Sequence, residues 1–133
     1  MAVTFSHTIV HSTDKKASSS FLVEVLGLPV PTAFGHFLVV DLANGASLDF
    51  IDAGGMKFDR QHYAFLVGEE EFDPIFERIR SRGLDYWADP FKKHPGEISR
   101  HDGGRGFYFD DPDGHLLEVL TRTYGSGSRS DPR

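Results

Sequence analysis

The sequence contains no cysteine, no cluster of basic residues and no long hydrophobic run. The absence of cysteine excludes disulfide bonds and thiolate metal ligands. With a formal net charge of −6, the chain is not expected to bind nucleic acid or an anionic membrane. No apolar stretch has the length of a membrane span, and the first residues lack a signal-peptide pattern, so we expect a cytoplasmic protein.

What the sequence does contain is enough material for one hydrophobic core. It has 133 residues, of which 39% are hydrophobic and 13% aromatic, and twelve of them are phenylalanine. This length and composition predict one compact domain, or two very small halves that share a core, with an aromatic-lined interior or cavity, and we place the domain at about residues 4–124. Residues 125–133 (GSGSRSDPR) are small, polar and end near a proline, which predicts a disordered tail.

The domain repeats one pattern of elements. In module one, at about residues 4–53, a strand over 5–12 precedes an amphipathic helix over 14–26 that Gly27 ends. Three short strands follow at 30–34, 37–42 and 46–52. Asn44-Gly45 is a strong hairpin signal between the last two. The predicted order of elements in module one is therefore strand, helix, strand, strand, strand.

Module two, at about residues 60–124, has the same order. A strand over 61–67 is followed by a helix that we expect to begin at Asp73-Pro74 and to end at Gly83. Strands are predicted at 85–88, 106–109 and 115–121, and a polar loop over 90–104 is long enough to suggest a functional or mobile segment. Gly27 follows His7 by 20 residues and Gly83 follows His62 by 21, so the two modules have a similar register.

Three residues are candidates for binding a divalent metal ion. His7 and His62 stand near the start of the first strand of each module, so a pseudo-twofold relation would bring them to one place. Glu118 interrupts an apolar strand, and a carboxylate that faces inward needs a compensating charge. Two imidazoles and one carboxylate are the ligand set of an open divalent-metal site. The alternative is that Glu118 faces solvent and that Leu117 and Val119 face the core.

Four further residues are candidates for the chemistry around such a site. Asp49 is the counterpart of Glu118 in module one, so it would be a fourth ligand, a carboxylate that orients a histidine, or an exposed acid. Tyr108 and Arg105 lie in the segment GGRGFYF, where Tyr108 would donate a hydrogen bond or a proton to a substrate and Arg105 would contact it. The alternative for Tyr108 is an aromatic residue of the barrel wall. His101, in the long loop, is a candidate acid or base.

The sequence resembles the vicinal oxygen chelate superfamily, also called the glyoxalase/bleomycin-resistance/dioxygenase family, over about residues 4–124. The resemblance is most specific in GGRGFYFDDPDGHLLEVL, together with SHTIV near the N-terminus and QHYAFLV in the middle of the chain. It implies an α+β fold in which two tandem βαβββ modules form a cupped, barrel-like mixed sheet. His7, His62 and Glu118 match the metal-ligand positions of the family, and Asp49 falls where glyoxalase I has a fourth ligand, a glutamate.

The resemblance implies several functions rather than one. The favoured expectation is a metal-dependent enzyme with extradiol-dioxygenase-like activity on a small substrate that binds through two oxygens. Fe²⁺ is the favoured ion, and Zn²⁺, Ni²⁺ and Mn²⁺ are alternatives. A glyoxalase-type lyase or isomerase and a fosfomycin-type thiol transferase are the other enzymatic expectations. An antibiotic-sequestering protein of the bleomycin-resistance kind is the expectation from a different class.

Neither of two subfamilies is matched in full. Extradiol dioxygenases and fosfomycin-resistance enzymes both keep a tyrosine at the position of Tyr108, ten residues before Glu118. Ser47 stands where extradiol enzymes have a second acid/base histidine, and Ile9 stands where fosfomycin enzymes have a threonine. The resemblance also implies a homodimer in which His7 of one subunit joins His62 and Glu118 of the other, and a site within one chain remains the alternative.

Overall fold

The computed structural model describes residues 2–126. Within it the chain divides into two compact units: unit 1 runs up to Asp59 and includes Asp111–Asp113, and unit 2 comprises Arg60–Asp110 and the chain from Gly114 onward. The tail that we predicted to be disordered falls mostly outside the described residues, which include only its first two members.

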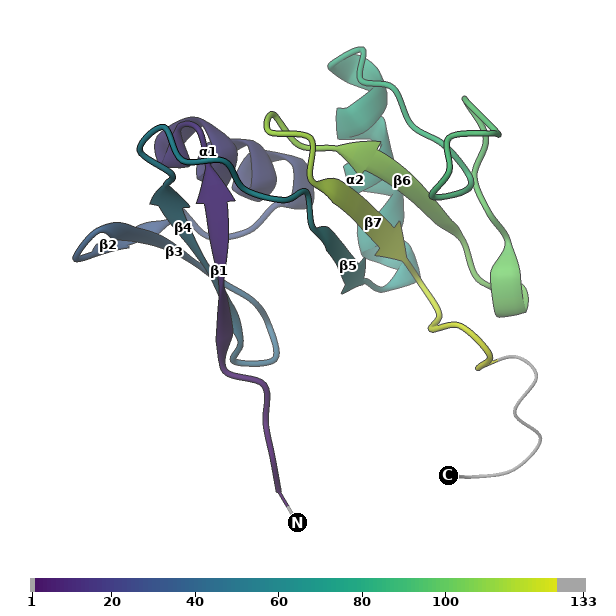
Figure 1. The fold of residues 1–133 in the computed structure, drawn as a ribbon. Coiled ribbons are helices and arrows are strands. Elements are labelled where there is room, and N and C mark those ends of the chain that lie inside the picture. The colour runs from purple at the N-terminus through teal and green to yellow at the C-terminus, as the bar shows by residue number, and fades with distance from the viewer. Residues whose placement is uncertain (1, 127–133) are drawn as a thin grey trace. The chain divides into compact units, whose positions relative to one another are not determined.

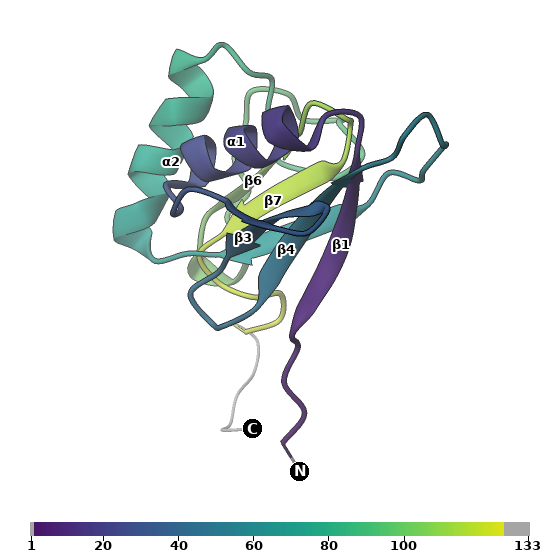
Figure 2. The same ribbon diagram turned by 90° about the vertical axis from the view of Figure 1, so that its left-hand side faces the viewer.

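Unit 1 is a four-stranded mixed sheet with one helix. Its elements are β1 (His7–Ser12), α1 (Lys15–Leu26), β2 (Thr32–Phe34), β3 (Phe37–Asp41) and β4 (Ser47–Asp52). The strand order is β1-β4-β3-β2, in which β1 and β4 are parallel and the other pairs are antiparallel. Figure 2 shows β1, β4 and β3 side by side. All five elements agree with the sequence prediction to within two residues at each end.

The ends of α1 follow from local chemistry. Asp14 caps the helix, because its Oδ1 accepts hydrogen bonds from the backbone N–H groups of Lys16 at 3.0 Å and Ala17 at 3.3 Å. Gly27 ends it in the left-handed region at φ 72°, which glycine adopts without steric cost. The buried side of the helix and the sheet supply the core of unit 1, whose main members are Val10, Leu22, Val25, Val40, Leu48 and Phe50.

Unit 2 is a three-stranded mixed sheet with one long helix. Its elements are β5 (His62–Leu66), α2 (Glu69–Ser81), a short 3₁₀ turn η1 (His101–Gly103), β6 (Gly106–Asp110) and β7 (Leu116–Leu120). The strand order is β5-β7-β6, with β5 and β7 parallel and β6 antiparallel to β7. Figure 1 shows the three strands next to one another, with α2 behind them.

The prediction that α2 begins at Asp73-Pro74 is wrong, because the helix begins one turn earlier, at Glu69. The carboxylate of Glu71 accepts a hydrogen bond from the backbone N–H of Gly68 at 3.0 Å, and the three acidic residues of the first turn favour the positive end of the helix dipole. Pro74 therefore lies inside the helix, where it lacks the N–H that would bond to the preceding turn.

The strand predicted at 85–88 is reduced to isolated bridges. Trp87 pairs with Tyr108 through two backbone hydrogen bonds, of 2.9 and 2.8 Å, and forms a second bridge with Pro95. Pro90 and Pro95 flank the turn that follows, and proline has no N–H to extend a ladder. The loop over 90–104 is nevertheless ordered by backbone bonds, such as the pair between Ser99 and Gly106.

The core of unit 2 lies between one face of its sheet and α2. Phe107 is fully buried, and its ring contacts the rings of Phe72, Phe76 and Tyr86, with centroids 5.3–6.1 Å apart. The other buried members of this core are Ile75, Ile79, Phe109, Leu117 and Val119. The aromatic interior that the composition predicted is therefore concentrated in this unit.

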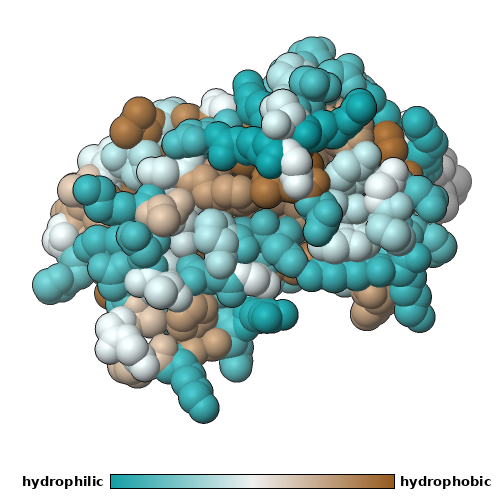
Figure 3. All heavy atoms as spheres, turned by 90° about the horizontal axis from the view of Figure 1, so that it is seen from above, coloured by the Kyte–Doolittle hydropathy of each residue, from teal (hydrophilic) through white to brown (hydrophobic). Residues whose placement is uncertain are grey.

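The fold is α+β, and two βαβββ modules account for its two mixed sheets, as the sequence predicted. Some hydrophobic side chains remain exposed, among them Phe5, Phe34, Leu66 and Phe91. On the face drawn in Figure 3, brown hydrophobic residues lie among teal hydrophilic ones. None of the helices in the described part of the chain is long and apolar enough to cross a membrane.

Candidate metal centre

The register of the unit 2 sheet brings three candidate residues to one face. Glu118 on β7 is paired with Ala64 on β5 and with Tyr108 on β6. His62 lies two residues before Ala64, so its side chain points to the same side of the sheet as Glu118. The opposite face carries Phe107 and the rest of the core. Glu118 is nevertheless 2% exposed, so the interpretation that it faces solvent is wrong.

His62 and Glu118 are in direct contact. His62 Nε2 lies 3.1 Å from Glu118 Oε1, and His62 Nδ1 lies 3.0 Å from the carbonyl oxygen of Leu116. Because a carbonyl oxygen only accepts, Nδ1 carries the hydrogen and donates it. Nε2 is then either the second N–H of an imidazolium or a lone pair aimed at a carboxylate oxygen. The second arrangement is repulsive unless a cation beside the contact binds to both atoms.

Two tyrosines close over this pair. The hydroxyl of Tyr124 donates a hydrogen bond to Glu118 Oε2, and the hydroxyls of Tyr108 and Tyr124 are hydrogen-bonded to each other. The ring of Tyr108 stacks on the imidazole of His62, with centroids 5.9 Å apart and an angle of 27° between the planes. Both carboxylate oxygens of Glu118 therefore have a partner.

Both hydroxyls remain protonated at neutral pH. Burial raises the pKa of Tyr108, and the charge of Glu118 raises it further, although the hydrogen bond with Tyr124 acts in the opposite direction. Burial of its hydroxyl and then the hydrogen bond to Glu118 raise the pKa of Tyr124 well above its ordinary value. Each tyrosine is consequently a hydrogen-bond donor beside the candidate ligands.

The other half of the candidate ligand set lies in unit 1. His7 begins β1 and is exposed, and its Nδ1 lies 2.9 Å from the hydroxyl of Ser6. Asp49 is paired with Ile9 on β1 and Val39 on β3, which is the register that Glu118 has with Ala64 and Tyr108 in unit 2. In unit 1 this carboxylate accepts a hydrogen bond from the hydroxyl of Ser47 at 2.7 Å.

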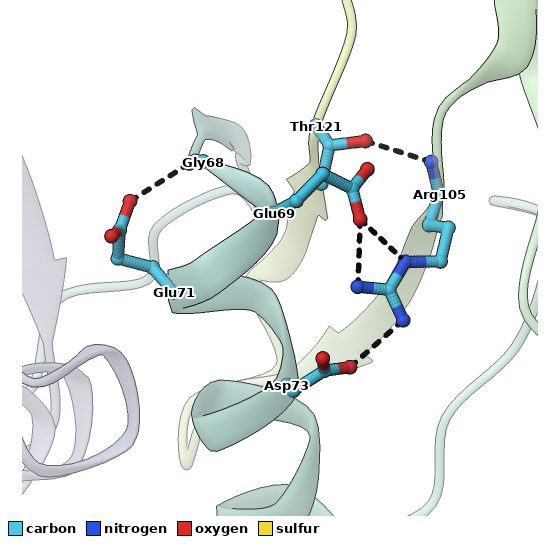
Figure 4. Close-up of polar contacts among 6 residues, drawn as sticks. All are labelled: Gly68, Glu69, Glu71, Asp73, Arg105 and Thr121. Atoms are coloured by element: carbon cyan, nitrogen blue, oxygen red, sulfur yellow. Dashed lines mark hydrogen bonds and ion pairs between the residues drawn. The ribbon is translucent and has the colours of Figure 1, made fainter.

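His101 and Arg105 differ in their surroundings. His101 is exposed in η1, and its ring meets the edge of the Tyr124 ring at 6.2 Å between centroids. The guanidinium of Arg105 bonds to Glu69 at 2.7 and 2.9 Å and to Asp73 at 2.8 Å, as Figure 4 shows, and it lies 4.2 Å from the centroid of the Phe72 ring. These contacts with α2 engage the hydrogen-bond donors of Arg105. A role of Arg105 in substrate binding therefore stays a prediction.

The ion pairs of Arg105 with Glu69 and Asp73, here called the Arg105 cluster, shift the pKa values of its members. Hydrogen bonds from Thr121 and then Arg105 lower the pKa of Glu69 below its ordinary value. The hydrogen bond to Asp73 raises the pKa of Arg105, and the bond to Glu69 adds to this effect. The Arg105 cluster joins the start of β6 to the first turns of α2, so it holds the strand that carries Tyr108 against this helix.

The residues of unit 2 fit a divalent ion in chemical type. Glu118 is a buried carboxylate, and His62 presents Nε2 while its other nitrogen is held by a backbone carbonyl, which is the outer bond that metal-binding histidines usually make. Among residues 2–126, however, no group of three or more His, Asp or Glu side chains is gathered closely enough to hold a metal ion. The pair of His62 and Glu118 is thus the part of the predicted triad that the structure brings together.

Sequence reasoning missed Tyr124. It lies six residues after Glu118, beyond the end of β7, next to the segment predicted to be disordered. No periodicity or spacing pointed to it, because a turn rather than a strand carries it back over the sheet. A lone tyrosine between polar residues close to a candidate ligand was the only available signal.

Known proteins resemble the chain over most of its length. A family model described as "Glyoxalase/Bleomycin resistance protein/Dioxygenase superfamily" matches residues 4–119. A glutathione transferase FosA from Serratia marcescens is 31% identical over 126 residues, which are 90% of this chain and 81% of that protein.

Two solved structures, each called an oxidase, are more similar. Oxidase ChaP-H2 has 57% identity and a TM-score of 0.92, with 96% of this chain and 99% of that one covered. Oxidase ChaP-H1 has 59% identity and a TM-score of 0.91, with 94% and 100% covered. Together with the family model, these relatives show that the chain belongs to the glyoxalase/bleomycin resistance protein/dioxygenase superfamily.

Proposed function

We propose that this protein is a metal-dependent enzyme that holds one divalent ion with His7, His62 and Glu118. Iron(II) is the ion that we propose. The reaction is an oxidation by dioxygen of a small substrate with two adjacent oxygens, of the extradiol-dioxygenase type. We further propose that the protein is a homodimer whose fold forms one catalytic domain over about residues 4–124.

The observation that carries the proposal is the contact between His62 Nε2 and Glu118 Oε1. An imidazole with its hydrogen on Nδ1 and a buried carboxylate are directed at each other at 3.1 Å. For the neutral imidazole, a divalent cation bound by both atoms satisfies the pair, and the proposal takes this arrangement rather than an imidazolium that donates to Glu118. His7 is proposed as the third ligand because it occupies the same place in β1 that His62 occupies in β5, at the start of a strand parallel to the last strand of its unit.

The oxidative reaction is favoured by the relatives of highest identity. Two proteins called oxidases share 57% and 59% of their residues with this chain over nearly its whole length. The carboxylate at the place of Glu118 in unit 1 is Asp49, which is shorter than a glutamate and is bonded to Ser47. Three protein ligands on an octahedral ion would leave three positions, two for a bidentate substrate and one for dioxygen.

In the proposed reaction the metal ion and Tyr108 have separate tasks. The metal, when bound, supplies Lewis acidity and a template for the two substrate oxygens. Tyr108 donates a hydrogen bond or a proton to a substrate oxygen, because its hydroxyl lies on the ligand face and remains protonated. In ring cleavage by dioxygen both oxygen atoms enter the product, so no external reductant is required.

The test is oxygen uptake by anaerobically purified protein loaded with Fe²⁺, measured against a panel of catechols. We expect one or more members of the panel to consume dioxygen and to give a ring-opened product. Glu118→Ala, loaded in the same way, is the matched control and is expected to be inactive. Uptake that is no faster with the wild-type protein than with Glu118→Ala contradicts the proposal.

A thiol transferase is the second candidate, and its support is the FosA relative at 31% identity. Ile9 counts against this candidate, because this partly exposed residue of β1 stands where fosfomycin enzymes have a threonine. Consumption of glutathione in the presence of an epoxide phosphonate, without oxygen uptake, would favour this candidate over the oxidase.

A further inference from the structure

We propose that Tyr124 is a positioning residue that assigns different roles to the two oxygens of Glu118. It holds Oε2 by a hydrogen bond and thereby leaves Oε1, beside His62 Nε2, to face the metal. The inference rests on the proposed metal site, and it adds a residue that neither the sequence motifs nor the proposed ligand set includes.

The two carboxylate oxygens of Glu118 have different partners. Oε1 of Glu118 lies 3.1 Å from His62 Nε2, whereas Oε2 accepts the hydrogen bond of the Tyr124 hydroxyl. Glu118 is 2% exposed, so water does not take the place of either partner. A carboxylate that binds a metal through both oxygens would have to release this hydrogen bond. While it persists, Glu118 offers one oxygen.

The hydrogen bonds of the two tyrosines have a fixed direction. Tyr124 has one hydroxyl hydrogen and gives it to Glu118, so the hydroxyl of Tyr108 must be the donor in the bond between the two tyrosines. The chain Tyr108 to Tyr124 to Glu118 therefore has a fixed polarity. When Tyr108 turns its hydrogen toward a substrate, Tyr124 loses a donor but keeps its own bond to Glu118.

Tyr124 is itself held in place by the turn that follows it. The backbone N–H of Gly125 donates to Asp102 Oδ2 at 2.8 Å, and Ser126 N–H donates to the carbonyl of Thr123 at 3.1 Å. These bonds form a turn around Gly125, which has a φ of 79°, and attach it to η1. Tyr124 is about half exposed as a residue, so this attachment, rather than burial of its ring, keeps its hydroxyl over Glu118.

The consequence is that loss of the Tyr124 hydroxyl frees Glu118 to turn and to use both oxygens. Hydrogen-bond partners of metal ligands typically account for about 10- to 100-fold in metal affinity. We therefore expect Tyr124→Phe to bind metal about 10- to 100-fold more weakly and in a different coordination. A residue that only supports the fold would leave the coordination unchanged.

The experiment uses the full-length protein titrated with Co²⁺ under anaerobic conditions, with the visible absorption bands of the ion as the readout of its coordination. The chain has four tyrosines, which provides a matched control. Tyr86→Phe removes the same atom in the same unit, from a residue whose ring packs on Phe76 and Phe107 rather than over Glu118. Circular dichroism establishes that each variant is folded.

A changed Co²⁺ spectrum for Tyr124→Phe, with a wild-type spectrum for Tyr86→Phe, supports the inference. An unchanged spectrum for Tyr124→Phe, or the same change in Tyr86→Phe, overturns it. If the wild-type protein binds no Co²⁺, the proposed metal site fails, and the inference fails with it. If the wild type binds the ion and Tyr124→Phe gives the same spectrum, only the inference fails.

A second pair of variants decides the matter if Tyr124→Phe does not fold. Asp102 has a φ of 56°, which both glycine and asparagine tolerate. Asp102→Gly removes the acceptor for Gly125, whereas Asp102→Asn retains an oxygen that accepts the same bond. The spectral change in Asp102→Gly with a wild-type spectrum in Asp102→Asn supports the role of Tyr124, and wild-type spectra in both overturn it.

Discussion

Two neighbouring residues of β6 should respond to substitution in opposite ways, because they face opposite sides of the unit 2 sheet. Phe107 is fully buried against α2, and its ring contacts four other aromatic rings, those of Phe72, Phe76, Tyr86 and Phe109. Tyr108 lies on the ligand face, bonded to Tyr124 and stacked on His62. Phe107→Ala should therefore lower stability, and Tyr108→Phe should affect chemistry.

The size of the stability effect follows from the buried ring. Replacing a buried phenylalanine by alanine costs about 3–5 kcal/mol, because transfer free energy is lost and a cavity remains. For a chain of this length that corresponds to a fall in Tm of about 10–20 °C. Tyr108→Phe keeps the ring and removes a single hydrogen bond, which is worth about 1 kcal/mol.

Urea unfolding of the metal-free proteins measures both effects. The only tryptophan of the sequence, Trp87, is bonded through its backbone to Tyr108, so its fluorescence reports on unit 2. We expect the midpoint of Phe107→Ala to fall far below that of the wild type and that of Tyr108→Phe to stay close to it. Equal destabilisation by the two substitutions would refute the assignment of faces.

Three further outcomes are expected. Tyr108→Phe should slow oxygen uptake by about 100-fold or more, while the metal content measured by mass spectrometry is unchanged. A loss of bound metal as large as the loss of oxygen uptake would contradict a role of Tyr108 in proton transfer. Because the pKa of Glu69 is lowered by Thr121 and Arg105, its bonds should stabilise the fold above the ordinary glutamate pKa of 4.5 and cease to do so as the pH falls below it. The Tm difference between the wild type and Glu69→Gln should thus be present at neutral pH and vanish in acid, whereas a difference that is constant with pH would argue against this ion pair. Sedimentation velocity should give the mass of a dimer, and a monomer would refute the proposed homodimer.

Much of the fold could be predicted because the local signals and the tertiary structure agree. Asp14 caps the start of α1 with its carboxylate, and Gly27 ends the helix in the left-handed conformation. The resemblance to the superfamily led to the placement of Glu118 beside His62, and the structure pairs their two strands in parallel, as it pairs the first and last strands of unit 1.

The errors arose where two local signals competed. Asp73-Pro74 is a strong start signal for a helix, but Gly68 and the three glutamates after it form an earlier one, and the helix runs through the proline. The segment at 85–88 has the composition of a strand, yet the prolines nearby limit it to single bridges at Trp87. Tyr124 could not be found, because its position over Glu118 depends on the turn that Asp102 anchors.

The most direct test of the proposed metal centre is metal analysis of protein purified anaerobically and loaded with Fe²⁺, with Glu118→Ala and His62→Ala treated in parallel. We predict about one divalent ion per chain in the wild type and almost none in either variant, because three ligands leave no full set once one is removed. A wild-type protein that holds no ion, or variants that hold as much as the wild type, would contradict the account.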